Sequence, residues 1–515
     1  MKQVSFSAVR LPLATALSAI LMLPSAWAMD SGSTGADGVL SPTSNVDIQL
    51  PDSGVLNYTT VNIPVGVTVK FIKNSGNTPV YLLASGNVTV AGIINIAGAD
   101  ARPTGTYGDG VQNDDGRSGE GGPGGYSGGS GGRGDAQQRV AIIRGGAGLG
   151  PGGGPGGLEG GNGCSPTAGY FRYVGTGGAY AQNTYKYYST YNCAANYGPS
   201  GTAYGSALLQ PLIGGSGGGG GRGGTTYPGS GGGGGGGAIL IASSGTLSIT
   251  GTIDANGGDG GGITGDGIGG QGAGGSGGAI RLMATRVEGN GKLYANGGCI
   301  NYNNSRRQYC TYTGHNGYGG SEGRIRIEGD AIAFNGTSQP AHVADTPGSV
   351  FIASAPALRI VSVAGTAIPA NPTGVADVTL PASTSQGPIQ VGFETTNVPV
   401  GNVVTLRVTP THGTPVEAIS PAIAGSTAAG STQATITLPA GASTLQATTT
   451  YTVVIAALQD EALSERLMRL AENERVEKIE VTVALEGGAT ARLFTASGKH
   501  IDLPYEAVSA VGFRG

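Results

Sequence analysis

The chain alternates between apolar and polar residues in a stretch that runs from Leu247 to Asn256. Leu247, Ile249, Ile253 and Ala255 share one parity, and the residues between them are glycine or polar. A period of two residues predicts a strand with one face in a core and the other in solvent. We therefore expect a half-buried strand here, with these four residues inward.

The same alternation occurs again before and after this stretch, each time behind an apolar run. Repeats of about 20 residues that cannot bury their apolar face alone are built for stacking. The sequence thus predicts a stacked β core, which we expect the preceding strand-like segments Val46–Leu50, Val55–Ile63 and Val67–Ile72 to cap. The inward positions of the other copies are Val88, Val90, Ile94 and Ile96, and Val287, Leu293 and Ala295; the apolar runs are Val80–Leu83, Ala238–Ala242 and Ala279–Ala284, and a degenerate copy spans Ile325–Gly336.

Glycine-rich tracts separate the copies, at residues 98–237, 257–278 and 297–322. All three leave the repeat just after the same point, which predicts loops that grow from one corner of the stack. Glycine loses much backbone entropy on ordering and has no side chain to bury, so the tracts are consistent with disordered excursions. A bundle of extended, left-handed polyglycine II helices is the alternative. The irregular glycine spacing argues against that alternative, because it lacks a strict triplet.

The low content of charged residues bears on which kinds of partner the protein can bind. Glycine accounts for 101 of 515 residues, charged residues for only 12%, and the formal net charge is −4. So few charges imply neither nucleic acid nor an anionic membrane as a partner.

The first 28 residues have the three parts of a secretory signal peptide. A basic start precedes the apolar segment Leu11–Leu23, and small residues precede a cleavage site after Ala28. No later run reaches the ~18 apolar residues of a membrane span. We expect a mature chain that begins at Met29 and is secreted, extracellular or held at the cell surface.

Export makes the four cysteines candidates for disulfides. Three connectivities are possible, and we favour the local pairs Cys164 with Cys193 and Cys299 with Cys310, because each closes a loop within one excursion. The four histidines lie far apart in the sequence, so neither a metal site nor a nucleophile with a nearby base is indicated. We expect a non-enzymatic protein without cofactor or metal.

Tyrosines crowd the segment between Cys164 and Tyr204, and they recur in the second cysteine loop. Tyrosine offers rigid, amphipathic contact area, which suits recognition loops. Packing in a small local core is the other interpretation, because glycine tracts supply no core of their own. The candidate ligand-binding residues are Tyr185, Tyr187, Tyr188, Tyr191, Tyr309 and Tyr312.

The composition changes to Thr, Val, Ala and Pro from Leu358 onward, where short strand-like runs include Ala376–Leu380. About 100 residues with such runs and frequent turns are typical of an Ig-like sandwich. The tail predicts a helix over Asp460–Arg475 followed by strands at Ile479–Leu485 and Ala491–Thr495. The expected fold is mainly β: an interrupted parallel β-helix-like stack with Gly-rich excursions, then an Ig-like β-sandwich and a small α+β tail. The expected domains are 1–28, signal peptide; 29–345, stack; 346–456, sandwich; and 457–515, tail.

The leader, the glycine-rich excursions and two strand ends, Ile-Asp-Ala-Asn-Gly-Gly at 253–258 and Leu-Tyr-Ala-Asn-Gly-Gly at 293–298, carry a resemblance. Together they resemble secreted bacterial glycine-rich surface proteins with an adhesin-like β-solenoid core, over residues 38–340. The resemblance implies a non-enzymatic role in attachment, surface structure or filament formation. The repeats are fewer and more interrupted than in large haemagglutinin-type adhesins.

Three functions follow in order of preference. The first is a binding or adhesion protein whose Gly/Tyr-rich loops contact glycan or another cell-surface or matrix component. The second is a structural subunit of an extracellular filament or matrix, a homo-oligomer joined through sheet edges or the C-terminal helix. The third is a polysaccharide-degrading β-helix enzyme. Against the third, the outward positions are mostly Ser, Thr and Asn, with Asp254, Glu288 and Lys292 isolated.

Overall fold

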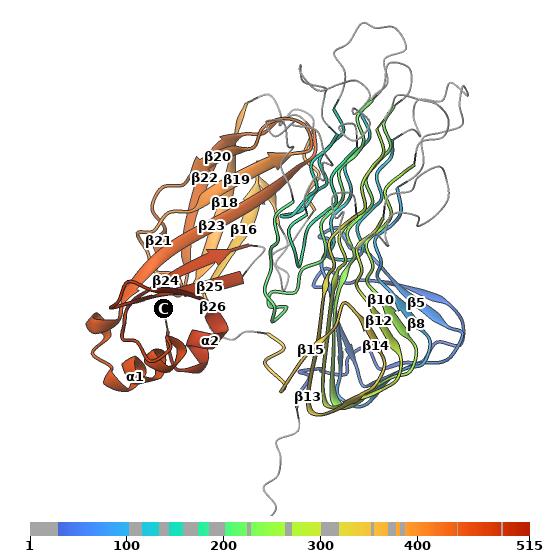
Figure 1. Ribbon diagram of the computed structural model, residues 1–515, viewed down its shortest axis with the longest axis horizontal. Helices are drawn as coiled ribbons and strands as arrows, with labels where there is room; N and C mark the ends of the chain where they lie inside the picture. The colour runs from blue at the N-terminus through green and yellow to red at the C-terminus, as the bar shows by residue number, and fades with distance from the viewer. Residues whose placement is uncertain are drawn as a thin grey trace, which may run out of the picture.

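The computed structural model describes residues 29–101, 116–132, 144–157, 174–184, 201–223, 228–262, 270–299, 319–351, 355–368, 377–381, 387–439, 441–485 and 488–514. Over these residues the protein is mainly β with few helices, and its parallel sheets are stacked. Figure 1 shows a stack of strands, a bundle of extended glycine-rich chain that continues from it, and a second β region alongside.

The stack consists of two sheets whose strands all pair in parallel, as the repeated alternation requires. Sheet A has nine strands and sheet B has six. Sheet A contains β1 (Val39–Leu40), β3 (Val55–Tyr58), β4 (Thr60–Ile63), β6 (Val80–Ala84), β7 (Val88–Val90), β9 (Ala238–Ile249), β11 (Ala279–Gly289), β13 (Arg324–Phe334) and β15 (Val343–Asp345). Sheet B contains β2 (Val46–Gln49), β5 (Thr68–Ile72), β8 (Ile93–Asn95), β10 (Thr252–Asp254), β12 (Lys292–Tyr294) and β14 (Thr337–Gln339).

The predicted parity of the repeat is confirmed. Leu247, Ile249, Ile253 and Ala255 all have 0% exposure in the core between the sheets. Equivalent positions of successive copies also lie directly beside one another: Ile253 pairs with Ile94 on one side and with Leu293 on the other. The copies therefore stack in one register, and each buries the apolar face of its neighbour.

The segment expected to cap the stack instead lengthens it. β2 and β5 pair in parallel with each other and β5 pairs with β8, so they belong to sheet B; β3 and β4 belong to sheet A. The reason is that the alternation continues there, with Val69 and Phe71 buried as Ile94 is. The edge strands are β1, β3 and β2 at one end and β15 and β14 at the other.

The described glycine-rich segments are ordered, as the bundle alternative proposes. In the segment 215–221, the amides of Gly218, Gly219 and Gly220 donate to carbonyls of three different neighbouring segments, at 2.8 to 2.9 Å. Gly221 returns to the neighbour that accepts from Gly218. A partner that recurs every third residue is the pattern of a helix with three residues per turn, as in polyglycine II.

The close approach of these segments explains why the glycines follow no triplet. A Cβ at Gly272 would lie 1.8 Å from the carbonyl oxygen of Gly231, and one at Gly175 would lie 1.9 Å from that of Gly219. The segment 215–221 exchanges hydrogen bonds with segments on all sides, namely 126–132, 144–149, 154–157, 174–178, 228–236 and 270–276. Because every face of such a segment meets backbone, glycine is needed at nearly every position.

The C-terminal β region has two antiparallel sheets that share one apolar core with two helices. The strand Val476–Ala484 pairs with the strand Ser443–Val454, so residues 457–514 pack with the region before them. Sheet C contains β16 (Ala357–Val363), β17 (Thr366–Ala367), β18 (Pro388–Thr396), β21 (Ala424–Gly425) and β22 (Gly430–Thr437). Sheet D contains β19 (Thr405–Pro410), β20 (Val416–Ile419), β23 (Ser443–Val454), β24 (Val476–Ala484), β25 (Gly488–Thr495) and β26 (His500–Pro504); the helical elements are η4 (Ile455–Leu458), α1 (Glu461–Leu470) and α2 (Tyr505–Ala510).

The helix predicted over Asp460–Arg475 is present, but it ends earlier than predicted, at Leu470. Asp460 is the N-cap, and its carboxylate accepts a hydrogen bond from the amide of Leu463 at 2.8 Å. The chain leaves the helix after Leu470, where Glu472 and Asn473 adopt positive φ angles of 53° and 66°. The predicted strand Ala376–Leu380 is not a strand over its described residues 377–380.

Candidate functional site

Most of the residues predicted to bind or to pair lie outside the described residues. These are Tyr185, Tyr187, Tyr188, Tyr191, Tyr309 and Tyr312, the cysteines Cys164, Cys193 and Cys310, and the cleavage residue Ala28. Cys299 is described and does not have a free thiol. The two disulfide pairings therefore stay predictions.

Two tyrosines of the Tyr-rich segment are described, and both serve packing. Tyr180 is buried at 1% exposure, and its ring centroid lies 4.9 Å from that of Tyr204. The guanidinium of Arg324, from β13, lies 4.7 Å from the Tyr180 ring centroid, and its Nη1 donates to the carbonyl of Tyr204 at 2.6 Å. This cluster ties the Tyr-rich segment to sheet A.

Burial governs the chemistry of these two phenols. It raises the pKa of Tyr180, which the charge and hydrogen bond of Arg324 oppose, and it raises the pKa of Tyr204 well above the ordinary value. The Tyr204 hydroxyl donates to the carbonyl of Gly214 at 2.6 Å and accepts from the hydroxyl of Ser216 at 3.0 Å. Both phenols therefore stay neutral and hold the base of the segment.

The ends of the glycine-rich segments gather at one end of the bundle, which we call the loop-bearing end. The amide of Ala101 donates to the carbonyl of Asp259 at 2.8 Å, and that of Gly260 donates to Cys299 at 2.7 Å. At the same end Gly132 donates to Gly221. The described chain is interrupted there between Ala101 and Gly116, Gly132 and Arg144, Gly157 and Val174, Gly223 and Pro228, Gly262 and Gly270, and Cys299 and Gly319.

Carboxylates at this end serve the backbone. An oxygen of Asp100 accepts from the amide of Asp259 at 2.8 Å, and an oxygen of Asp259 accepts from the amide of Cys299 at 2.8 Å. Within the described ranges, no three His, Cys, Asp or Glu side chains come together as a metal site. These two carboxylates thus tie the backbones of successive segments together at this end.

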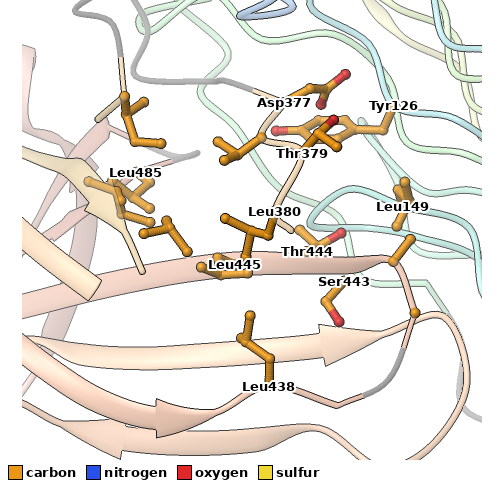
Figure 2. A pocket seen from close by; sticks show the side chains of 16 residues that line it. Tyr126, Leu149, Asp377, Thr379, Leu380, Leu438, Ser443, Thr444, Leu445 and Leu485 are labelled. Atoms are coloured by element: carbon orange, nitrogen blue, oxygen red, sulfur yellow. The ribbon is translucent and has the colours of Figure 1, made fainter. Parts of the chain in front are cut away.

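A cavity of about 430 Å³ lies between the bundle and the C-terminal β region (Figure 2). Tyr126 and Leu149 come from the bundle, whereas leucines including Leu438 and Leu445 come from the other side. Beside it, the amide of Gly150 donates to the hydroxyl of Thr444 at 3.0 Å. Its volume suits a small ligand, and most of its lining is apolar.

Asp377 is the carboxylic acid among the described residues that line this cavity. Burial raises its pKa, which the charge of Lys73 and a hydrogen bond from Asn77 oppose; burial likewise lowers the pKa of Lys73. Asp377 is exposed and Lys73 is partly buried, and the attraction between their charges favours the ionised form of each. The sequence signal for this cavity is that Tyr126 and Leu149 are large side chains among glycines, and sequence reasoning missed it.

Among the helices of the described residues, none is long and apolar enough to cross a membrane. Comparison of the chain with protein-family models, with curated proteins and with solved structures gave no match.

Proposed function

We propose that the protein is a secreted or surface-displayed, non-enzymatic binding protein whose Gly/Tyr-rich loops contact glycan or another cell-surface or matrix component. In this proposal the stack is a β-helix-like scaffold and the C-terminal β region an Ig-like spacer. The supporting observation is the loop-bearing end, where the glycine-rich segments end side by side. Recognition residues are commonly carried on loops that a rigid scaffold positions.

The bundle supplies the rigidity that this function needs. Its inner segments are held from several sides by backbone hydrogen bonds of about 3 Å. Ordering the base of the loops in advance lowers the entropy that binding would otherwise cost. The Arg324 contact to Tyr180 and Tyr204 adds a second anchor, on the described residues that flank the gap between Thr184 and Gly201, which is separate from the interruptions at the loop-bearing end and contains Tyr185, Tyr187, Tyr188 and Tyr191.

The test compares purified protein on a glycan array and on cell surfaces with two double variants. Tyr187→Ala with Tyr188→Ala removes contact area, and Cys164→Ser with Cys193→Ser removes closure of the loop. Each should reduce binding roughly tenfold while leaving the main unfolding transition unchanged. Arg286→Ala with Glu288→Ala, an exposed pair on sheet A, is the control. Full binding by both folded double variants would reject the loop-based function.

The open edges of the sheets favour the structural subunit as second candidate. Val39 on β1 and Val343 on β15 are 64% and 52% exposed, at opposite ends of sheet A. Parallel pairing of one end with the other end of a second copy would be head-to-tail and would extend indefinitely. Electron microscopy of concentrated protein checks this, with Val39→Lys as the variant that should block fibres. Monomers at every concentration would exclude it.

A further inference from the structure

The outer face of sheet B carries one continuous row of polar side chains. Residue by residue, the strand register places one outward side chain of each strand beside that of the next. With strands about 4.8 Å apart, five intervals make a row of about 24 Å. The row consists of Asp47, Lys70, Asn95, Asp254, Tyr294 and Gln339.

These side chains point outward because the residues next to them point into the core. Val69, Ile94, Ile253 and Leu293 are buried between the sheets, and the neighbouring positions are exposed or partly exposed. Figure 1 shows sheet B on the side of the stack away from the C-terminal β region.

Stacking brings together charges that look isolated along the chain. Lys292 pairs with Thr252, and Asp254 lies two residues further along the strand of Thr252. Lys292 and Asp254 therefore lie in adjacent rows of the same face, although they are far apart in the sequence. The formal charges of Asp47 and Asp254 balance those of Lys70 and Lys292. A balanced face gives no electrostatic attraction to nucleic acid or to an acidic polymer.

The chemistry of the row matches a polymer that is rich in hydroxyl groups. The carboxylates accept, the ammonium donates, and the carboxamides and the phenol do both, so the row as a whole supplies donors and acceptors that the hydroxyls of a sugar chain can satisfy. The Tyr294 ring offers a flat apolar surface for the C–H face of a sugar, and Ile93, 41% exposed, adds another in the adjacent row. A protein partner would call for a desolvated cluster of aromatic and Arg anchors, which these two rows do not provide.

We propose that this face binds an extended, uncharged polysaccharide chain that lies across the strands of sheet B. The proposal rests on the glycan-binding function proposed above, names the ligand class, and places it on a surface separate from the loop-bearing end. Each sugar unit would meet the side chains of roughly one strand, so that many weak contacts add along the row. Successive strands of sheet B would then contact successive sugar units of the polysaccharide.

The test measures binding of the purified full-length mature protein to soluble uncharged polysaccharides, a β-glucan and a xylan, by affinity electrophoresis. Tyr294→Ala and the double variant Asn95→Ala with Gln339→Ala should each weaken retardation roughly tenfold. The matched control is Arg286→Ala with Glu288→Ala, which removes exposed polar groups from sheet A. Thermal unfolding confirms that each variant is folded. Binding should change little with salt concentration, because the ligand carries no charge.

Any of three results would overturn the proposal. The first is retention of both polysaccharides by the sheet B variants at the strength of the wild type. The second is failure of the wild type to bind either polysaccharide. The third is a steep loss of binding with salt, which would point to an anionic polymer as the ligand. The loop variants separate this proposal from the loop-based function. If both hold, Tyr187→Ala with Tyr188→Ala should lose cell-surface binding and keep polysaccharide retardation. Loss of retardation in this loop variant, with none in the sheet B variants, would support the loops and reject sheet B.

Discussion

Arg281 and Glu328 form an ion pair that is almost completely buried on the outer face of sheet A. Nε of Arg281 lies 2.9 Å from Oε1 of Glu328, and the side chains are only 2% and 1% exposed. The pair also holds the segment that leads to the C-terminal β region. Gly348 donates its amide to Glu328 at 2.8 Å, and Arg281 donates to the carbonyl of Ser349 at 3.1 Å.

Removal of one member of this pair should be costly. Glu328→Gln leaves the buried Arg281 without its counter-charge, so the free energy of unfolding should fall by about 3 to 5 kcal/mol. The control is the exposed pair Arg286–Glu288, whose two members both lie on β11. Glu288→Gln should cost less than about 1 kcal/mol. Chemical denaturation measures both, and equal losses would mean that burial does not set the energy.

Acid should weaken the stack through the same carboxyl. Burial raises the pKa of Glu328, but the hydrogen bond and charge of Arg281, the amide of Gly348 and a hydrogen bond from Arg326 outweigh it and lower the pKa below 4.5. A carboxyl whose pKa is lower in the folded state contributes stability above its unfolded pKa and loses it as the pH falls through the folded pKa.

The prediction is therefore a difference between two proteins. Stability of the wild type should decline below pH 4.5, and Glu328→Gln should flatten that decline. Denaturant titrations at several pH values measure it. Parallel curves for the wild type and the variant would assign the decline to other carboxyls.

The close packing of the bundle predicts a strong contrast between two glycines. A Cβ at Gly272 would lie 1.8 Å from the carbonyl oxygen of Gly231, whereas the nearest atom to one at Gly319 is 3.4 Å away. Backbone on the facing segment cannot rotate away as a side chain does. Gly272→Ala should cost at least about 1 to 3 kcal/mol, and Gly319→Ala should stay within about 0.5 kcal/mol. Thermal unfolding measures both; tolerance of Gly272→Ala would contradict the packing.

The two faces of the repeat can be compared at neighbouring positions. Ile253→Asp places an unpaired carboxylate between the sheets and should cost several kcal/mol or prevent folding. Asp254→Asn keeps the side-chain oxygen that accepts from the amide of Asn256 at 3.0 Å, so it should change stability by less than about 0.5 kcal/mol. Denaturation of both variants checks the parity. Similar losses would contradict it.

Local patterns predicted the core, because alternate residues of each strand are apolar and are buried between the sheets. The stacking of Ile94, Ile253 and Leu293 follows from that alternation and from the common exit point of the excursions. The bundle was harder to predict. A glycine at every third position is expected only when one face of a three-residue helix contacts a neighbour. In the segment 215–221 every face contacts a neighbour, so glycine is needed at nearly every position.

Contacts between distant residues could not be predicted from local pattern. Arg281 lies within the otherwise apolar run Ala279–Ala284, and its partner Glu328 is 47 residues away. The row on sheet B and the cavity beside Tyr126 likewise depend on register and packing between separate elements. The predicted recognition tyrosines lie outside the described residues, so their role stays a prediction.

The threefold pattern of hydrogen bonds in the bundle has a consequence for how such a protein can change in length during evolution. Inserting three residues into the segment 215–221 would return every later amide to the neighbour that it faced before, at a cost of one added turn of about 9 Å. Inserting one or two would turn each amide toward a different neighbour. Descendants of this chain can thus lengthen the distance between scaffold and loops only in whole steps of three residues, and several segments must lengthen together.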